Sequence, residues 1–309
     1  MEIFARASYR DEPLPDGAEA FLRRDNPRLV ELEARYRAFD VPATRHSLWT
    51  DAYLESEVAL GYFRGDGAYV WQYRDLNTQD KILRTAAYID ARDAWRGLEE
   101  PGGYGAYLFE DANGRLLSRD LIDSAVEIDF LERTLGLSTR PGVNILDIGA
   151  GYGRMGLHLT RAYPKIGRVL CADGVAQSTF LAEYYLAARG AARAEAIPID
   201  ALRAALKETP VFLATNIHSF SECDLAAVTW WLDLLVAHDV PYLMVVPNAD
   251  EHGGTRMLTT EPDDTQLDYR AAITERGFVC VADSPKYLEE AVQTGGVSPT
   301  RHVLFRREV

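Results

Sequence analysis

The residue pattern with the clearest chemical meaning is a glycine-rich run that follows an apolar segment. Residues 144–156 read NILDIGAGYGRMG, with glycines at positions 149, 151, 153 and 156. Glycine lets a backbone turn sharply and approach a ligand with no side chain in between. The run therefore predicts a strand, a ligand-binding turn and the start of a helix.

The spacing of this run admits two kinds of ligand. Gly151, Gly153 and Gly156 match the GxGxxG pattern of dinucleotide sites, and Asp173 follows Gly153 by 173 − 153 = 20 residues. However, Asp147 places a carboxylate directly before the glycines, where it would repel a pyrophosphate and attract an ammonium group. S-Adenosylmethionine has an ammonium group and no phosphate, and its ribose hydroxyls suit the Asp173 carboxylate. We favour this ligand, and NAD, which an oxidoreductase would use, stays the alternative.

Apolar segments recur through the second part of the chain and alternate with helical patterns. From about residue 116 the strand candidates are, in order, NILDIGA, RVLCADG, RAEAIPID, PVFLATNI, PYLMVVPN, GFVCVADS and HVLFRRE. Apolar periodicity and stop signals predict helices over residues 120–137, 176–189 and 224–238. This alternation predicts an α/β fold with a mostly parallel sheet that is covered by helices on both faces.

The first part of the chain has a different texture. Residues 1–115 are rich in Arg, Tyr and Trp and lack alternating strand and helix signals. A chain of 309 residues is long enough for two domains. We predict a mainly helical lid or substrate region over residues 1–115 and a cofactor-binding domain over residues 116–309.

Composition and charge exclude several classes of function. The chain has 33 Lys and Arg residues against 47 Asp and Glu residues, a formal charge of −14. This balance argues against a general nucleic-acid binder, which needs clustered cations. No signal peptide or membrane anchor is recognisable, and Cys171, Cys223 and Cys280 follow no zinc or disulfide pattern. The sequence thus predicts a cytoplasmic protein that acts on a small molecule or oligosaccharide, and it leaves a homodimer open.

Two strings carry a resemblance to a known class of enzyme. ILDIGAGYG and VLCADG resemble motifs of the class I S-adenosylmethionine-dependent methyltransferases. The resemblance covers about residues 116–309 and implies a Rossmann-like seven-stranded sheet whose last strand runs antiparallel. It also implies an acidic residue beside the adenine after the third strand, where IPIDAL offers Asp200. The residues assigned to the cofactor are Asp147, Gly149, Gly151, Tyr152, Gly153, Asp173, Gly174, Asp200 and Asn216.

Four further strings suggest a narrower family. YFRGDGAYVWQYRD, SRDLIDSAVEIDFLE, GAGYGRMG and NIHSFSECD are similar to the bacterial sugar O-methyltransferases, which include mycobacterial enzymes of methylmannose polysaccharide synthesis. This resemblance implies methylation of a hydroxyl on a sugar or oligosaccharide such as a mannoside. Methylation of a phenol or an amine, and a catalytically silent scaffold, remain the rival interpretations.

Aromatic side chains in the first part of the chain are candidates for contact with such a substrate. A neutral sugar suits aromatic and hydrogen-bonding groups, and the same aromatic residues could equally belong to the core. The residues concerned are Trp49, Tyr53, Tyr62, Tyr69, Trp71 and Tyr73, with Arg64, Gln72 and Arg74 between them. Those assigned to the substrate are Tyr53, Tyr62, Arg64, Trp71 and Tyr73.

Methyl transfer to a hydroxyl requires alignment of the reacting atoms and removal of a proton. The loop NIHSFSECD carries His218 and Glu222, and the loop PNADEHGG carries Asp250, Glu251 and His252, each after a predicted strand. We expect His218 or His252 to be the base, with Glu222 as a further catalytic candidate. Asp250 and Glu251 could hold Mg²⁺, or they could be solvated loop carboxylates. The histidines that lack such a position, and that we leave unassigned, are His46, His158, His238 and His302.

Overall fold

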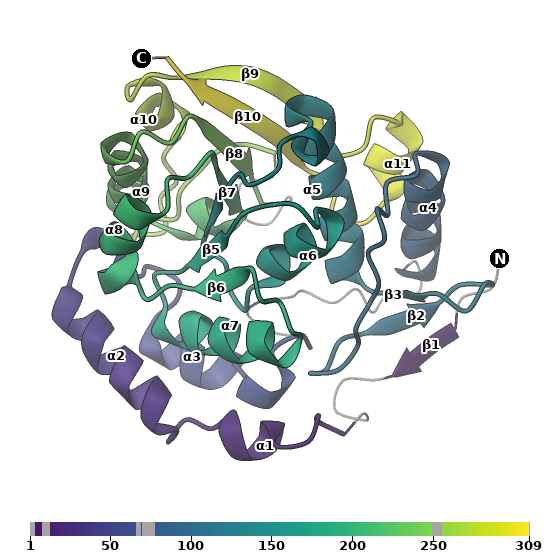
Figure 1. Ribbon diagram of the computed structural model, residues 1–309, viewed down its shortest axis with the longest axis horizontal. Coiled ribbons are helices and arrows are strands. Elements are labelled where there is room, and N and C mark those ends of the chain that lie inside the picture. The colour runs from purple at the N-terminus through teal and green to yellow at the C-terminus, as the bar shows by residue number, and fades with distance from the viewer. Residues whose placement is uncertain (1–3, 8–12, 66–68, 70–77, 249–254, 309) are drawn as a thin grey trace.

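The computed structural model of the chain contains a seven-stranded mixed sheet (Figure 1). It describes residues 4–7, 13–65, 69, 78–248 and 255–308. The strands lie in the order β6-β5-β4-β7-β8-β10-β9. Their bounds are β4 (Ile145–Ile148), β5 (Val169–Ala172), β6 (Ala194–Ala196), β7 (Leu213–Ile217), β8 (Tyr242–Val246), β9 (Phe278–Pro285) and β10 (Arg301–Arg307).

The directions of the strands confirm the predicted fold class. β6, β5, β4, β7 and β8 pair in parallel, whereas β10 runs antiparallel to both β8 and β9. Each predicted strand segment is present, and the expected antiparallel last strand is confirmed. β4 and β7 are neighbours in the sheet. From β4 the chain continues to β5 on one side of this pair, and from β7 it continues to β8 on the other side. The carboxyl ends of β4 and β7 therefore flank the point where doubly wound sheets bind their ligands.

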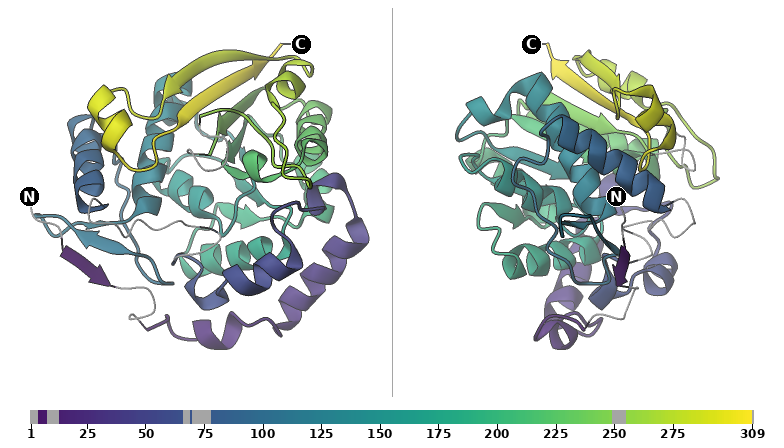
Figure 2. Two further views of the ribbon diagram at one scale, coloured as in Figure 1. Left: turned by 180° about the vertical axis from the view of Figure 1, so that it is seen from behind. Right: turned by 90° about the vertical axis from the view of Figure 1, so that its right-hand side faces the viewer.

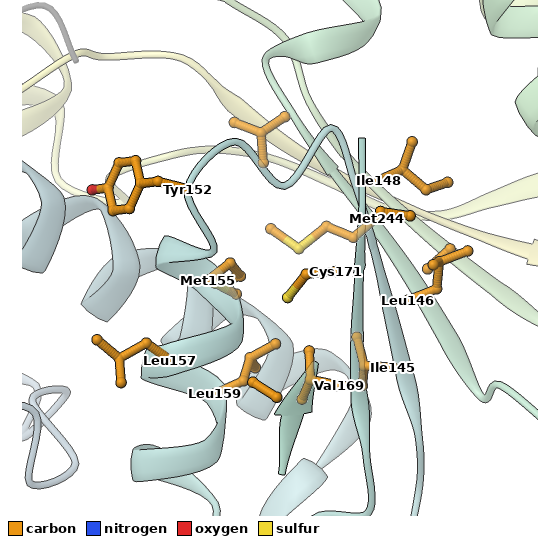
Figure 3. Close-up of a cluster of buried hydrophobic side chains, with 14 of the residues drawn as sticks. Ile145, Leu146, Ile148, Tyr152, Met155, Leu157, Leu159, Val169, Cys171 and Met244 are labelled. Atoms are coloured by element: carbon orange, nitrogen blue, oxygen red, sulfur yellow. The ribbon is translucent and has the colours of Figure 1, made fainter. Parts of the chain in front are cut away.

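The glycine run forms the connection between β4 and helix α6 (Arg154–Ala162). Met155 and Leu159, which are four residues apart on α6, face Cys171 and Val169 of β5 (Figure 3). A side chain at Gly156 would collide with the Cys171 sulfur, so the helix can lie this close to the strand only with glycine there. This packing holds the turn above the sheet.

The helices predicted from apolar spacing are present with small differences at their ends. They are α5 (Arg119–Leu135), α7 (Ala176–Ala188) and α9 (Leu225–Ala237), and the remaining helices of this region are α8 (Ile199–Glu208), α10 (Arg270–Thr274) and α11 (Glu290–Gly295). The Ser118 hydroxyl accepts a hydrogen bond from the Leu121 N–H, 3.1 Å away, at the start of α5. Asp224 caps α9 in the same way through the Ala227 N–H, at 2.7 Å. Both caps satisfy backbone donors that have no partner inside the helix.

The first 115 residues form the mainly helical extension that the sequence predicts, together with a small sheet that it does not. The helices are α1 (Ala18–Phe21), α2 (Pro27–Phe39), α3 (Asp51–Glu57) and α4 (Thr78–Ala91). The small antiparallel sheet has the order β1-β2-β3, with β1 (Phe4–Ala7), β2 (Leu108–Glu110) and β3 (Leu116–Leu117). β3 lies just beyond residue 115, and the domain boundary proposed there stays a prediction.

The extension packs along the margin of the main sheet. Helices α1 to α3 follow one edge of the molecule, seen from behind in Figure 2, with α2 against α7 and α8. Helix α4 packs against α5 and α11. Buried side chains of the extension and of the sheet region belong to one continuous apolar cluster. Of the helices described in the structure, none has the length and apolar character required to cross a membrane.

A buried ion network joins the extension to α5. Arg64 is only 1% exposed and donates to Asp120 at 3.0 Å, to Glu100 at 2.9 Å and to the Gly102 carbonyl at 2.9 Å. Tyr152, in the glycine turn, also donates to Asp120. Removing one partner from such a network leaves the others charged and desolvated, which is costly.

We expect Arg64→Met to lower the free energy of unfolding by about 3–5 kcal/mol, because Asp120 and Glu100 would stay buried without their cation. Urea denaturation followed by circular dichroism measures this change. The matched control is Arg23→Met, whose partner Asp25 is exposed and which should leave the stability nearly unchanged. Equal, small effects of both substitutions would show that the buried network contributes little.

Candidate functional site

A cavity lies at the carboxyl ends of β4, β5 and β7, beside the glycine turn. It is enclosed by the turn itself, by the loop after β7 and by residues from the extension. The lining residues are Ala43, His46, Trp49, Tyr69, Asp147, Gly149, Ala150, Gly151, Tyr152, Arg154, Met155, Asp173, Gly174, Val175, Ser178, Ile217, His218, Ser219, Glu222, Cys223 and Trp231. Most of the predicted cofactor residues are therefore brought together here.

The glycine turn is built so that the backbone itself faces the cavity. Gly149, Gly151 and Gly153 have φ angles of 68°, 55° and 87°, in the left-handed region that glycine adopts without strain. A Cβ atom at Gly149 would collide with the Ser219 side chain, and one at Gly174 with the Ala43 carbonyl. Gly153 shapes the turn without lining the cavity. Glycine at positions 149 and 174 therefore lets Ser219 and the Ala43 carbonyl pack directly against the backbone.

Two buried carboxylates flank the turn. Asp147 accepts a hydrogen bond from the Thr215 hydroxyl at 2.7 Å, and burial raises its pKa to about 7. Asp173 accepts from the N–H groups of Gly151, at 2.9 Å, and Val175, at 2.8 Å. Burial raises the pKa of Asp173 to about 6 against the lowering effect of these bonds. Asp173 therefore fastens the turn to the end of β5 while it lines the cavity.

The extension supplies one wall of the cavity. The Trp49 indole donates to Glu222 at 2.9 Å, and the hydroxyls of Tyr69 and Ser178 share a hydrogen bond of 3.0 Å. The Trp49 and Tyr69 rings lie 5.2 Å apart. Trp49 and Tyr69 belong to the aromatic set that the sequence singles out, and among the described members of that set they are the ones that line the cavity.

His46 is a wall residue that the sequence does not reveal. Its Nε2 lies 3.1 Å from the carbonyl oxygen of Gly174, a residue 128 positions away in the chain. Burial lowers the pKa of His46, so the ring is neutral near pH 7. His46 lies in no motif and next to no strand end, so only the tertiary fold identifies it.

His218 and Glu222 both line the cavity on the loop after β7. His218 has a φ angle of 69°, and its buried Nδ1 has no hydrogen-bond partner among the residues described. Burial, followed by the charge of Arg119, lowers its pKa to about 3. A ring with this pKa holds a proton weakly, which counts against the prediction that His218 is the base. Glu222 accepts from Trp49 and from the Asn248 amide, at 3.3 Å.

Two predicted cofactor residues do not reach the cavity. Asp200, in the first turn of α8, forms a two-point ion pair with Arg35 of α2, at 2.9 and 3.0 Å. Asn216 is fully buried, where its amide donates to the Ser219 hydroxyl at 2.6 Å and accepts from the Phe220 N–H at 3.0 Å. Asn216 shapes the loop that carries Ser219, and Asp200 anchors α2. Both residues lie outside the cavity lining.

Arg64, Tyr53 and Tyr62, which the sequence analysis assigns to the substrate, also lie outside the cavity lining. The Arg64 guanidinium is buried and donates hydrogen bonds to Glu100 and Asp120. Tyr53 packs edge-on against Trp49, with ring centroids 5.6 Å apart, outside the cavity lining. Tyr62 lines a separate surface hollow near residues 13–23. The spacing of aromatic residues along the chain therefore did not identify which of them face the cavity.

The remaining predicted residues fall outside the part of the chain that the structure describes. They are Trp71, Tyr73, Asp250, Glu251 and His252, together with Gln72 and Arg74. Within residues 4–7, 13–65, 69, 78–248 and 255–308, no group of three His, Cys, Asp or Glu side chains is arranged to hold a metal ion. A magnesium site at Asp250 and Glu251 stays a prediction.

No protein-family model matches the chain, and no curated protein matches its sequence. Similar solved structures include the magnesium protoporphyrin IX methyltransferase of Synechocystis PCC 6803 with bound S-adenosylhomocysteine (13% identity, 74% of this chain and 98% of that chain, TM-score 0.43). A methyltransferase from Aquifex aeolicus has 16% identity over 56% of this chain and 87% of that chain, with a TM-score of 0.41. The mitomycin 7-O-methyltransferase has 19% identity over 62% of this chain and 57% of that chain, with a TM-score of 0.39. At such scores we take neither substrate nor residue roles from them.

The strand order and the glycine turn together define the type of fold. The strand order, the antiparallel β10 and the glycine turn after β4 are those of the class I methyltransferase type of α/β fold. The cavity stands at the carboxyl ends of its central strands.

The raised pKa of Asp147 predicts a pH-dependent stability that Asp147→Asn removes. The folded state binds the Asp147 proton more tightly than the unfolded state, so this contribution is complete below about pH 4 and is lost as the pH rises to about 7. Relative to Asp147→Asn, the wild-type protein should lose about 1.4 kcal/mol of unfolding free energy per pH unit within that window. Urea denaturation at pH 5, 6, 7 and 8 gives the comparison. Asp264→Asn, an exposed control, should parallel the wild type, and parallel curves for Asp147→Asn would contradict the expectation.

Proposed function

We propose that the chain is an S-adenosylmethionine-dependent methyltransferase. The observation that carries this proposal is the charge of the cavity beside its open glycine turn. Asp147, Asp173 and Glu222 line the cavity, and none of them forms an ion pair with a described residue. When they are ionised, carboxylates without an ion-pair partner attract a ligand with sulfonium and ammonium charges and repel a pyrophosphate. The same charges disfavour NAD and hence the oxidoreductase alternative.

The residues around the cavity fit such a cofactor. Asp147 would hold the ammonium group, Gly149 and Gly151 provide open backbone beside it, and Asp173 has acceptor positions left for ribose hydroxyls. Bound there, S-adenosylmethionine supplies an activated methyl group that transfers to a nucleophile and leaves a neutral thioether. Trp49 and Tyr69 line the cavity, and apolar rings at its wall would exclude water beside a bound ligand and strengthen the electrostatic contacts there.

We propose further that the acceptor is a hydroxyl, on a sugar or oligosaccharide such as a mannoside. The aromatic pair of Trp49 and Tyr69 suits a neutral acceptor with an apolar face, and the strings that resemble sugar O-methyltransferases favour the same class. A non-sugar small molecule remains the second candidate. Alignment of the hydroxyl would provide up to about 7–11 kcal/mol of the acceleration.

Glu222 is the best candidate for the base among the described residues. Its carboxylate lines the cavity and is oriented by the Trp49 indole and the Asn248 amide. His218 is disfavoured by its low pKa, and His252 lies outside the described residues. A positioned carboxylate that removes the hydroxyl proton would contribute about 10²–10⁴-fold.

Calorimetric titration with S-adenosylhomocysteine tests the cofactor. We expect the wild-type protein to bind it and not NAD, and Asp173→Ala to weaken binding by about 1.5–3 kcal/mol, the range for hydrogen bonds to a charged group. Asp200→Ala is the control, because its carboxylate pairs with Arg35 and should not affect affinity. Binding of NAD in place of S-adenosylhomocysteine would refute the proposed function.

Transfer of a labelled methyl group to a panel of mono- and oligosaccharides, with and without a chelator, identifies the acceptor and tests metal dependence. With that acceptor, Glu222→Gln should lower kcat by about 10²–10⁴-fold while the affinity for S-adenosylhomocysteine changes little. His218→Asn, which tolerates the left-handed backbone, should lower kcat less than about tenfold. The reverse order of the two effects would assign the base to His218. If activity requires a metal, the chelator should abolish it.

A further inference from the structure

A second hollow adjoins the cavity. It is lined by residues of α2, of α3 and of the start of α7, has a volume of about 480 Å³, and is called the outer hollow below. This volume is within the range of about 300–1,000 Å³ that small-molecule sites have. His46, Trp49, Gly174 and Val175 line both spaces and therefore form the boundary between them. The hollows near residues 13–23 and beside β10 share no lining residue with the cavity.

Gln177 provides the outer hollow with a hydrogen-bond acceptor that is not in use. Its side chain lines the hollow and is 7% exposed, and its Oε1 atom is buried with no hydrogen-bond partner among the described residues. A buried polar atom without a partner is costly. The first N–H groups of α7 have no partner inside the helix, and the N-cap residue Val175 provides no side-chain cap. The start of α7 therefore offers a ligand both donors and an acceptor.

The charges around the outer hollow favour a neutral ligand. Its charged lining residues are Arg24, Arg37, Glu33, Asp40, Asp51 and Glu55. An anionic ligand would meet more carboxylates than cations there. An ammonium group only donates hydrogen bonds and a phosphate only accepts them, whereas a hydroxyl does both. The start of α7 and the surrounding charges together suit a neutral group that is rich in hydroxyls.

Trp49 connects the outer hollow to the candidate base. Its side chain lines both spaces, and its indole N–H donates to Glu222, which lines the cavity, at 2.9 Å. Glu222 therefore lies on the cavity side of the boundary. A hydroxyl that enters from the outer hollow would meet the bound cofactor beside this carboxylate.

We propose that the outer hollow binds a second sugar unit of the acceptor, one that is not methylated, so that the acceptor is a neutral oligosaccharide rather than a monosaccharide. The inference rests on the proposed function and adds the place where the rest of the acceptor binds. Hydroxyls of the second unit would donate to Gln177 and accept from the start of α7, while the adjoining unit lies beside Trp49 and Glu222. Binding energy from the second unit would then help to hold the reacting hydroxyl in position.

The experiment measures transfer of a labelled methyl group to mannose, mannobiose and mannotetraose, and to glucose, maltose and maltotetraose. For one of the two series, we expect kcat/KM of the wild-type protein to be at least about tenfold higher for the oligosaccharides than for the monosaccharide. Gln177→Met removes the acceptor atom and should raise KM for the oligosaccharides about 3- to 10-fold, the range for one neutral hydrogen bond. It should change kcat/KM for the monosaccharide less than about twofold. Gln266→Met is the control, because Gln266 is exposed and lines neither space.

A second variant keeps the test independent of the buried position. Asp51 is an exposed residue in the first turn of α3 that lines the outer hollow, and Asp51→Ala should also raise KM for the oligosaccharides alone. Its matched control is Asp80→Ala, in the first turn of α4 and outside both spaces. Calorimetric titration of the same saccharides into protein saturated with S-adenosylhomocysteine gives their affinities without the reaction, and these should show the same selectivity.

Equal losses for monosaccharides and oligosaccharides in both variants, or no loss in either, would overturn the role of the outer hollow. So would a wild-type protein that methylates the monosaccharide as efficiently as the oligosaccharides, or one that binds S-adenosylhomocysteine and methylates none of these saccharides. A wild-type protein that does not bind S-adenosylhomocysteine would instead contradict the proposed function, so the two failures are distinct.

Discussion

A row of buried carboxylates on α5 is the constraint on which the arrangement of the other parts depends. Asp120, Asp123 and Glu127 are each at most 5% exposed. Charges buried this deeply are tolerated only when each has a cation or several hydrogen bonds. The cations come from distant parts of the chain: Arg64 pairs with Asp120, Lys286 with Asp123 and Arg154 with Glu127. α5 therefore fixes the extension, the segment after β9 and the glycine turn relative to one another.

This arrangement explains how the walls of the cavity are held in fixed positions relative to one another. Asp120 accepts hydrogen bonds from Arg64 of the extension and from Tyr152 of the turn. Glu127 orients Arg154, which follows the turn. Helix α5 thus fixes the position of the glycine turn, whose backbone faces the cavity. It also fixes the segment around Arg64, which precedes Tyr69 of the aromatic wall. The cavity depends on ion pairs that lie behind it, and a residue such as Arg64 supports the site without touching a ligand.

The parts of the structure that local rules govern could be predicted, and the parts that long-range partners govern could not. The strand ends and the glycine turn follow from apolar runs and from the geometry that glycine permits, and both are confirmed. Asp200 has the residue type and position that the resemblance implies, but its carboxylate forms an ion pair with Arg35 of α2. Arg64 has the residue type expected of a substrate contact, but it pairs with Glu100 and Asp120, and no local pattern in the sequence indicates these partners. His46 has no local sequence signal, because its partner Gly174 lies 128 residues away.

The titration of the cavity is governed by carboxylates rather than by histidines. Burial lowers the pKa of His46 and of His218, so neither ring gains charge near neutral pH. Burial raises the pKa values of Asp147 and Asp173 to about 7 and about 6, so these groups do change charge there. A cationic ligand favours the ionised carboxylates, and its binding must therefore displace the protons that they hold. Burial disfavours the ionised forms of Asp147 and Asp173. The same low dielectric strengthens their attraction for a cationic ligand of the proposed kind that binds between them.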